Sequence, residues 1–204
     1  RERRMAQRDE WLIGARRPRI FVEPDGDDHP LWDECLRLLD RVGMQLDDWQ
    51  LDILRASLRM RDGLWAAFSV GLCIPRQNGK NEILQARELI GALLLRETLI
   101  VHSAHLADTS IEAFRRMDDL IDTHKWLQEI TTVRRTNGRE AISFSLEDGS
   151  VCRIRFRTRT RGGGRGFSGS PVIFDESMAF PVVSQNSILP VMSAQPNPQA
   201  WYTG

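Results

Sequence analysis

The residues best suited to chemistry in this chain are Gly79 and Lys80, within the segment 74–81, Ile-Pro-Arg-Gln-Asn-Gly-Lys-Asn. An apolar run, 67–73, precedes the segment and a helix-like run, 82–96, follows it, so the pattern predicts a strand, a tight loop and a helix. A loop that opens a helix offers an anion free backbone N–H groups, the positive end of the helix dipole and, here, the lysine ammonium. The segment therefore predicts a phosphate-binding loop.

Two positions of this loop depart from the usual phosphate-loop pattern, in which a glycine opens the loop and a serine or threonine follows the lysine. Ile74 stands at the glycine position and Asn81 at the hydroxyl position. An amide oxygen is a weaker magnesium ligand than a hydroxyl closer to the backbone, so Asn81 is expected to bind the metal through water. Taken alone, the segment is also typical of an ordinary turn.

A second pair of reactive residues, Asp175 and Glu176, directly follows the apolar run 171–174. At such a strand end in phosphate-loop ATPases, the first acid holds magnesium and an adjacent glutamate polarises the attacking water. The alternative is a buried strand that meets solvent at a charged loop. The two motifs together favour the first interpretation, because the strands of a parallel sheet end at one edge, where ligands bind.

The elements needed to position these motifs predict an α/β fold with a central, mostly parallel β-sheet flanked by helices. Residues 98–104 form a further buried strand pattern, and Thr109 to Glu112 has the spacing of a capping box that opens a helix. His105, in the loop between them, is expected either to be a solvated loop residue or to approach DNA or substrate. This strand, loop and helix make one more β-α unit.

The loop sequence Pro-Arg-Gln-Asn-Gly-Lys-Asn, with Val-Ile-Phe-Asp-Glu at 172–176, resembles the ATPase domain of tailed-phage large terminase subunits. The resemblance implies a phosphate-loop NTPase of the ASCE/RecA-like type that hydrolyses ATP with Mg²⁺ to drive double-stranded viral DNA into a procapsid. It implies a catalytic role for Lys80, contact of Arg76 with the γ-phosphate, and a water-positioning role for Glu176. The implied nucleotide ligands are Arg76, Gln77, Asn78, Gly79, Lys80 and Asn81, and the implied magnesium ligands are Asp175 and Asn81.

Three further roles follow from the resemblance. Gln50 would read the adenine edge, for which a primary amide is suited because it donates and accepts at once; otherwise it is a polar position on an amphipathic helix. Thr203, at the end of a last strand pattern, would sense the γ-phosphate. Arg165, with Arg161 behind it, would reach a neighbouring subunit's triphosphate as an arginine finger; the alternative is a flexible surface loop.

A hairpin is predicted where residues 141–146 and 151–160 flank an Asp-Gly turn. On the returning strand every second residue from Arg153 to Arg161 is an arginine, so five guanidinium groups would share one face, opposite Ile154 and Phe156. Two interpretations stay open: a stripe that contacts DNA phosphates, or arginines paired with acids of this chain or a neighbour. Because Lys plus Arg equals Asp plus Glu, at 28 each, any DNA contact must be local.

The chain is expected to comprise an N-terminal helical appendage, 1–43, packed on an ATPase core, 44–204, and to be a fragment without the nuclease domain that large terminases carry. No apolar run reaches the length of a bilayer. Three widely spaced cysteines, Cys35, Cys73 and Cys152, are expected to be buried thiols.

The resemblance also implies partners: double-stranded DNA, a portal protein, a small terminase subunit and further copies of the chain in a ring, with the host cytoplasm as the place of action. Two alternatives remain. A helicase-like DNA-dependent ATPase would share the fold, and a non-enzymatic nucleic-acid-binding module would use only the arginine face.

Overall fold

The computed structural model describes residues 18–75, 77–159, 169–179, 192 and 195–204. The helices of these residues are α2 (Trp32–Arg41), α3 (Asp48–Ser57), α4 (Lys80–Leu93), α5 (Ala107–Asp122), α6 (Lys125–Ile130) and a 3₁₀ turn, η1 (Ser177–Ala179). The strands are β1 (Met60–Arg61), β2 (Leu64–Trp65), β3 (Ser69–Leu72), β4 (Leu99–Ala104), β5 (Thr131–Arg134), β6 (Ala141–Ser145), β7 (Val151–Thr158), β8 (Val172–Phe174) and β9 (Ala200–Thr203).

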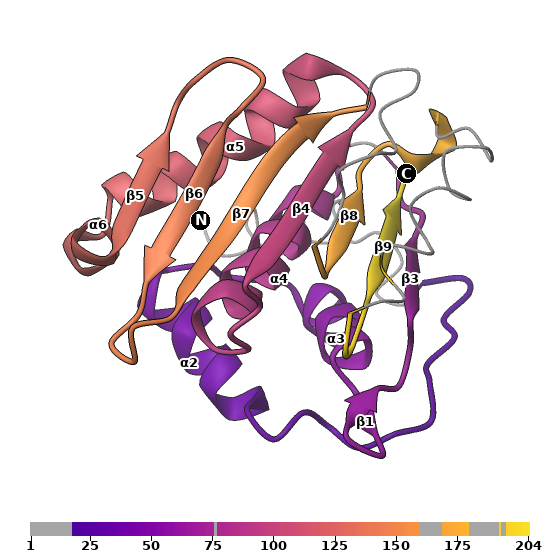
Figure 1. The fold of residues 1–204 in the computed structure, drawn as a ribbon. Coiled ribbons are helices and arrows are strands. Elements are labelled where there is room, and N and C mark those ends of the chain that lie inside the picture. The colour runs from indigo at the N-terminus through magenta and orange to yellow at the C-terminus, as the bar shows by residue number, and fades with distance from the viewer. Residues whose placement is uncertain (1–17, 76, 160–168, 180–191, 193–194) are drawn as a thin grey trace, which may run out of the picture.

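Seven strands form one sheet in the order β3-β9-β8-β4-β7-β6-β5, while β1 and β2 pair separately. The five strands from β3 to β7 in this order run parallel, and the hairpin strands β6 and β5 are antiparallel additions. The parallel strands therefore end at one edge of the sheet, where the phosphate loop and the acidic pair lie (Figure 1). This confirms the predicted mostly parallel α/β sheet.

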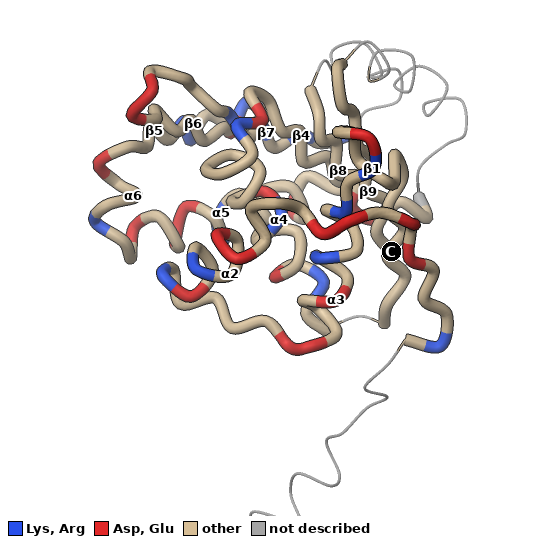
Figure 2. The backbone as a smooth tube through the Cα atoms, turned by 90° about the horizontal axis from the view of Figure 1, so that it is seen from below, with Lys and Arg blue, Asp and Glu red and all other residues tan. Residues whose placement is uncertain are grey.

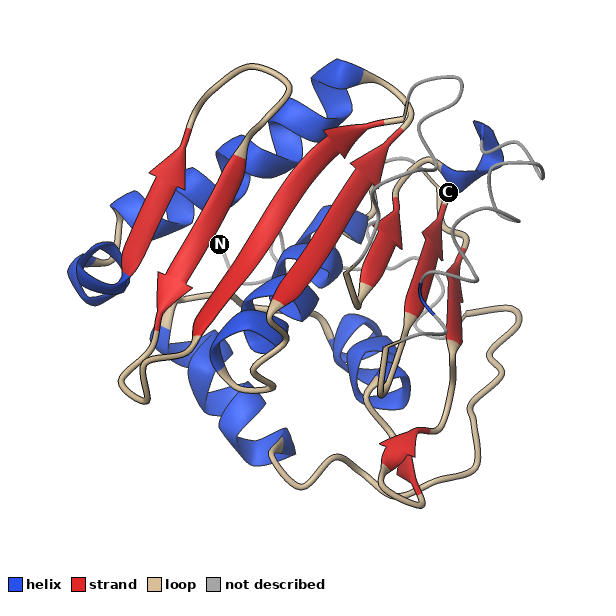
Figure 3. Ribbon diagram, viewed as in Figure 1, coloured by secondary structure: helices blue, strands red, loops and turns tan. Residues whose placement is uncertain are grey.

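The helices α2, α4, α5 and α6 lie together on one face of the sheet (Figures 2 and 3). Strand residues that point to this face, such as Ile100, Phe144 and Phe156, are fully buried in a single apolar cluster with Leu89 of α4 and Phe114 of α5. Residues of α2 belong to the same cluster, and α2 packs against α4. Burial of this face supplies the main stabilisation of the fold.

The opposite face of the sheet divides into two parts. Around β8 and β9 it carries a small apolar cluster that includes Val101, Val172 and Phe174. Around the hairpin it carries arginines, and the pairing of Val101 with Arg155 places the border between the two parts along β4 and β7. One sheet thus offers a buried apolar face and a face that changes from apolar to basic.

A buried ion pair anchors α4 to the rest of the core. The Arg87 guanidinium donates to both carboxylate oxygens of Glu97, at 2.7 Å each, and also to Gln199 Oε1. Gln199 in turn donates to the Ser57 carbonyl. Gly91 makes room for the pair, because a Cβ at this position would lie 2.1 Å from Glu97 Oε2. Through Gln199, the pair therefore connects α4 with the end of α3 and with the start of β9.

Two local predictions are wrong. Helix α5 begins at Ala107, so Thr109 lies inside the first turn and makes no capping box, and its hydroxyl instead bonds to Glu176. Cys73 is exposed because it follows the last residue of an edge strand, whereas Cys35 and Cys152 are buried thiols. Within the described residues, no helix combines the length and apolar character needed to cross a membrane.

Candidate functional site

The phosphate-loop candidate connects β3 to α4, as predicted. Gly79 directly precedes the first residue of α4, Lys80, and has a left-handed backbone with φ of 75°. A Cβ at Gly79 would lie only 2.4 Å from Gln50 Nε2, so both the backbone and the space require glycine. The free N–H groups of the first turn of α4 point into the loop, which is the arrangement that binds anions.

Gln50 lies on α3 beside this loop and is 4 % exposed. Its Oε1 accepts a hydrogen bond from Asp47 N, at 2.7 Å, and its Nε2 donates to the Gly79 carbonyl, at 2.8 Å. The side chain therefore ties the loop to α3. Adenine recognition by Gln50 stays a prediction, and it would use the remaining N–H and lone pair of the amide.

Asp175 is the centre of the charged cluster at the carboxyl edge of the sheet. Lys80 Nζ lies 2.5 Å from its Oδ1, and the same oxygen accepts hydrogen bonds from Thr203 Oγ1, at 2.7 Å, and Glu176 N, at 2.9 Å. Burial by itself raises the pKa of Asp175, but the hydrogen bond from Lys80 and the charge of His102 outweigh it and hold the pKa below its usual value. The carboxylate is thus kept ionised although it is 2 % exposed.

Glu176 follows in a left-handed conformation, with φ of 54°. A non-glycine residue in this region is uncommon and is found where a fold requires a particular side-chain direction. Its Oε1 accepts a hydrogen bond from Thr109 Oγ1, at 3.1 Å, whereas its buried Oε2 has no protein partner among the described residues. The second oxygen is therefore suited to a water molecule.

His102 and Glu88 form a buried pair that the sequence did not reveal. His102 lies in β4, not in the following loop, and its Nδ1 is 2.6 Å from Glu88 Oε1 on α4. Its Nε2 lies 3.9 Å from Asp175 Oδ2. Burial by itself lowers the pKa of His102, but the charge and hydrogen bond of Glu88 and the charge of Asp175 outweigh it, so the pKa is raised.

The predicted stripe of five arginines is wrong at Arg159. Strand β7 ends at Thr158, so the alternation of faces stops there, and the Arg159 guanidinium turns over the carboxyl ends of β4 and β8. It donates to the backbone carbonyls of Ser103, at 2.6 Å, and Asp175, at 2.5 Å, with a longer bond to that of Glu176. Burial lowers its pKa, and the two nearby acids oppose this effect.

The other predicted site residues lie as follows. Gln77 and Asn78 are exposed in the loop, Asn81 is partly buried in the first turn of α4, and Thr203 is fully buried at the end of β9, between β3 and β8. His105 is exposed between β4 and α5. Arg76, Arg161 and Arg165 lie outside the described residues.

The residues present fit a hydrated magnesium ion better than a cation held by protein atoms alone. Among the described residues, no group of three or more His, Cys, Asp or Glu side chains is placed to hold a metal. Asn81, Thr109 and Asp175, an amide, a hydroxyl and one carboxylate, border the same crevice between α4 and α5. Magnesium commonly takes one or two carboxylates and keeps several waters.

Comparison with known proteins gives a match in structure only. No family model matches the sequence, and a search of curated proteins found no match. The chain is similar to the large terminase of bacteriophage HK97, with a TM-score of 0.68 and 19 % identity over 85 % of this chain, and it spans 37 % of that protein. It is also similar to the ATPase domain of the Thermus phage P74-26 large terminase, with a TM-score of 0.61 and 18 % identity over 90 % of this chain and 70 % of that one.

A third similar structure is the large terminase of a further thermophilic bacteriophage, in complex with ADP, with a TM-score of 0.56 and 11 % identity over 76 % of this chain and 37 % of that protein. At these identities the comparisons establish the fold. The chain has the fold of large terminase ATPase domains, as its loop sequence led us to expect.

Proposed function

We propose that this chain is the ATPase domain of a large-terminase DNA-packaging motor, which hydrolyses ATP to move double-stranded DNA into a procapsid. The observation that carries the proposal is the contact between Lys80 and Asp175, which are 95 residues apart in sequence. They come from the two motifs that an ATPase of this fold needs, and they meet at the carboxyl edge of the sheet.

The Lys80–Asp175 pair is the arrangement expected of the site without nucleotide. Each buried or half-buried charge needs a partner of opposite sign. With a triphosphate and magnesium bound, Lys80 would hold the β- and γ-phosphates and Asp175 the hydrated metal, so each charge would exchange one partner for another. The bonds from Thr203 and the Glu176 backbone hold the Asp175 carboxylate in place during this exchange.

The roles in hydrolysis would then be divided among a small number of residues. Lys80 and the backbone N–H groups of residues 77–80 would bind the phosphates, Asp175 and Asn81 would hold hydrated magnesium, and Glu176 would orient the attacking water. Bound Mg²⁺ supplies charge neutralisation on the phosphate oxygens. The contact with Thr109 orients Glu176 towards the site, and Arg159 fixes the backbone of both acids through their carbonyls.

Further roles rest on the terminase likeness. Arg76 would contact the γ-phosphate in cis, and Arg165 or Arg161 would reach a neighbouring subunit's nucleotide, Gln50 would read adenine and Thr203 would sense the γ-phosphate. Residues 1–43 would be an appendage on the core 44–204, with a nuclease domain elsewhere in the full protein. The working motor would be a ring acting with a portal protein and a small subunit in the host cytoplasm.

Lysine substitution tests the proposal directly, because the sequence offers a matched control. The chain has two lysines, Lys80 and Lys125, and Lys125 is exposed at the start of α6. We expect Lys80→Ala to lose Mg-ATP binding, measured by titration of a fluorescent ATP analogue, while Lys125→Ala binds as wild type does. A folded Lys80→Ala variant with unchanged binding would refute the site.

The catalytic step needs a separate variant. Glu176→Gln should keep nucleotide binding and lower hydrolysis by about 10²–10³-fold, since it removes the group that orients water. Turnover that rises with protein concentration in the wild type, but not in Arg165→Ala, would support the trans arginine. Wild-type turnover independent of concentration and of Arg165 would leave an ATPase without that interface.

A further inference from the structure

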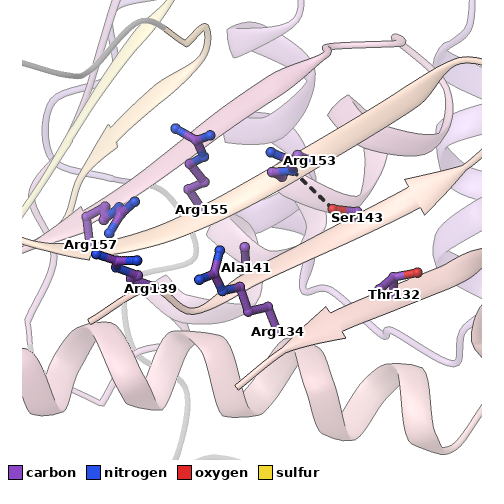
Figure 4. Close-up of a pocket in the computed structure, with 8 residues that line it drawn as sticks. All are labelled: Thr132, Arg134, Arg139, Ala141, Ser143, Arg153, Arg155 and Arg157. Atoms are coloured by element: carbon purple, nitrogen blue, oxygen red, sulfur yellow. Dashed lines mark hydrogen bonds between the residues drawn. The ribbon is translucent and has the colours of Figure 1, made fainter. Parts of the chain in front are cut away.

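An arginine-lined hollow of about 240 Å³ lies on the face of the sheet opposite the helices, over β5, β6 and β7 (Figure 4). We call it the arginine hollow. Hydroxyls of Thr132 and Ser143 and the methyl group of Ala141 complete its wall. Its cations come from β5, from the loop before β6 and from β7, and they are Arg134, Arg139, Arg153, Arg155 and Arg157.

The cations of the arginine hollow are not neutralised within the described chain. Arg153 donates to the Ser143 hydroxyl, at 3.1 Å, and Arg157 donates to the Gly138 carbonyl, at 2.6 Å. No ion pair with an acid is formed by any of the five among the described residues, whereas Arg135, which is adjacent in sequence, pairs with Asp118 at 2.7 Å. The sequence left open that the arginines pair with acids of this chain. For these five arginines, no such pairing occurs among the described residues.

The strands that carry the arginine hollow are anchored in the apolar core. Ile142, Ile154 and Phe156 alternate with the hollow residues along the same strands and are fully buried against the helices. Because these strands are anchored, the backbone positions from which the arginine side chains extend are fixed. Burial, together with the neighbouring charges of Arg153 and Arg157, lowers the pKa of Arg155, so the cations are close enough to affect one another.

We propose that the arginine hollow binds the phosphate backbone of double-stranded DNA. Arg153, Arg155 and Arg157 extend over about 13 Å of strand, and one strand of B-DNA carries about four phosphates along that axial length. A single small anion would neutralise only part of five charges. A polyanion with regularly spaced charges matches the row, and the planar guanidinium fork binds phosphate in bidentate fashion.

The composition of the hollow favours a duplex over other polyanions. It contains no aromatic side chain on which an unpaired base could stack, which single-strand-binding surfaces need. It also lacks the large apolar side chains that form the centre of a protein interface. The Thr132 and Ser143 hydroxyls, in contrast, are groups that contact phosphate in many protein–DNA interfaces.

In naming DNA as the ligand, this inference rests on the proposed function, and it assigns that contact to a particular surface. The net charge of the chain is zero, so no general positive field attracts DNA, and binding must depend on a local group of cations such as this one. The hollow lies on the other face of the sheet from the His102–Glu88 pair and the helices, so contacts with DNA and nucleotide can be removed separately.

The test is duplex binding without nucleotide, measured as the fluorescence anisotropy of a labelled DNA duplex over a range of salt concentrations. The variant carries Arg153→Gln, Arg155→Gln and Arg157→Gln. We expect its affinity at about 0.1 M salt to fall at least about tenfold and the slope of log affinity against log salt to fall by about 2.7, since each lost phosphate contact removes about 0.9.

A matched control loses the same charge elsewhere: Arg19→Gln, Arg61→Gln and Arg115→Gln, three exposed positions outside the hollow. This control should keep both affinity and slope. Equal loss in the two triple variants would overturn the proposal, as would unchanged binding in a hollow variant that urea unfolding shows to be folded. Stronger binding of single-stranded oligothymidine or of polyglutamate than of the duplex would also overturn it.

Lys80→Ala separates this inference from the proposed function. We expect it to bind the duplex as wild type does while losing ATP. Nucleotide binding retained in Lys80→Ala would contradict the ATPase site and leave the hollow intact, whereas duplex binding insensitive to the hollow arginines would contradict the hollow and leave the ATPase site intact.

Discussion

The carboxyl edge of the sheet, where Lys80 meets Asp175, and the arginine hollow both concentrate charge on the same sheet, but the charges are balanced differently in the two regions. At the edge, Lys80 pairs with Asp175 and His102 with Glu88, so each sign meets the other within the chain. In the hollow, five arginines lie together, and none of the described residues that line it is an acid. Buried charges must be neutralised by the fold itself, whereas like charges can remain together where water reaches them.

This difference distinguishes two kinds of binding site. The edge is a preorganised site whose internal partners can be replaced by a ligand, so binding there exchanges one ion pair for another. Among the described residues the hollow arginines have no acid partners to give up, so an anion that binds there gains from the release of counterions and from reduced repulsion. We expect affinity at the hollow to depend much more steeply on salt than affinity at the edge.

Removing a buried arginine should produce the largest effect on stability. Arg87 is fully buried and bonded to both oxygens of Glu97, so Arg87→Ala leaves a carboxylate that is only 11 % exposed without its cation. We expect the free energy of unfolding to fall by about 3–5 kcal/mol. Urea unfolding followed by circular dichroism measures this value, and a loss below about 1 kcal/mol would mean that the pair is not closed in solution.

The buried His102 should make stability depend on pH. Because its pKa is raised above the ordinary 6.5 in the folded chain, the native state binds more protons than the unfolded state above that pH. Its contribution is therefore complete below pH 6.5 and is lost as the pH rises through the native pKa, with a slope of at most about 1.4 kcal/mol per pH unit. Urea unfolding at several pH values measures this slope.

His102→Gln is the control for this titration, since an amide can still donate to Glu88 but does not titrate. The alkaline slope assigned to His102 should be absent from this variant. If the variant keeps the wild-type slope, another group is responsible for the pH dependence.

Arg155→Gln should have the smallest effect, although it removes the same type of side chain as Arg87→Ala. Arg155 has no acid partner among the described residues and lies between two other arginines, so its loss relieves repulsion. We expect the free energy of unfolding to change by less than about 0.5 kcal/mol, in the stabilising direction. Urea unfolding of both arginine variants compares the two regions, and a clear destabilisation by Arg155→Gln would mean that the hollow is neutralised from within.

Several parts of the fold and site could be predicted from local sequence. The loop at Gly79 and Lys80, the acids after 171–174 and the hairpin at 141–160 each have a pattern in which turn residues interrupt apolar runs. Parallel strands then bring the first two motifs to one edge without further information. The helix start at Thr109 was predicted wrongly because a capping-box spacing also occurs inside helices.

What the sequence determined by itself is the class of fold and the two charged motifs, since both follow from residue types at short separations. Only the tertiary structure decided which groups each charged side chain contacts. The alternation of arginines could not show that β7 ends before Arg159, which then donates to the carbonyls of Ser103 in β4 and of Asp175 after β8. The sequence also could not show that His102 pairs with Glu88, because such contacts depend on how a helix lies across a strand and not on any local pattern.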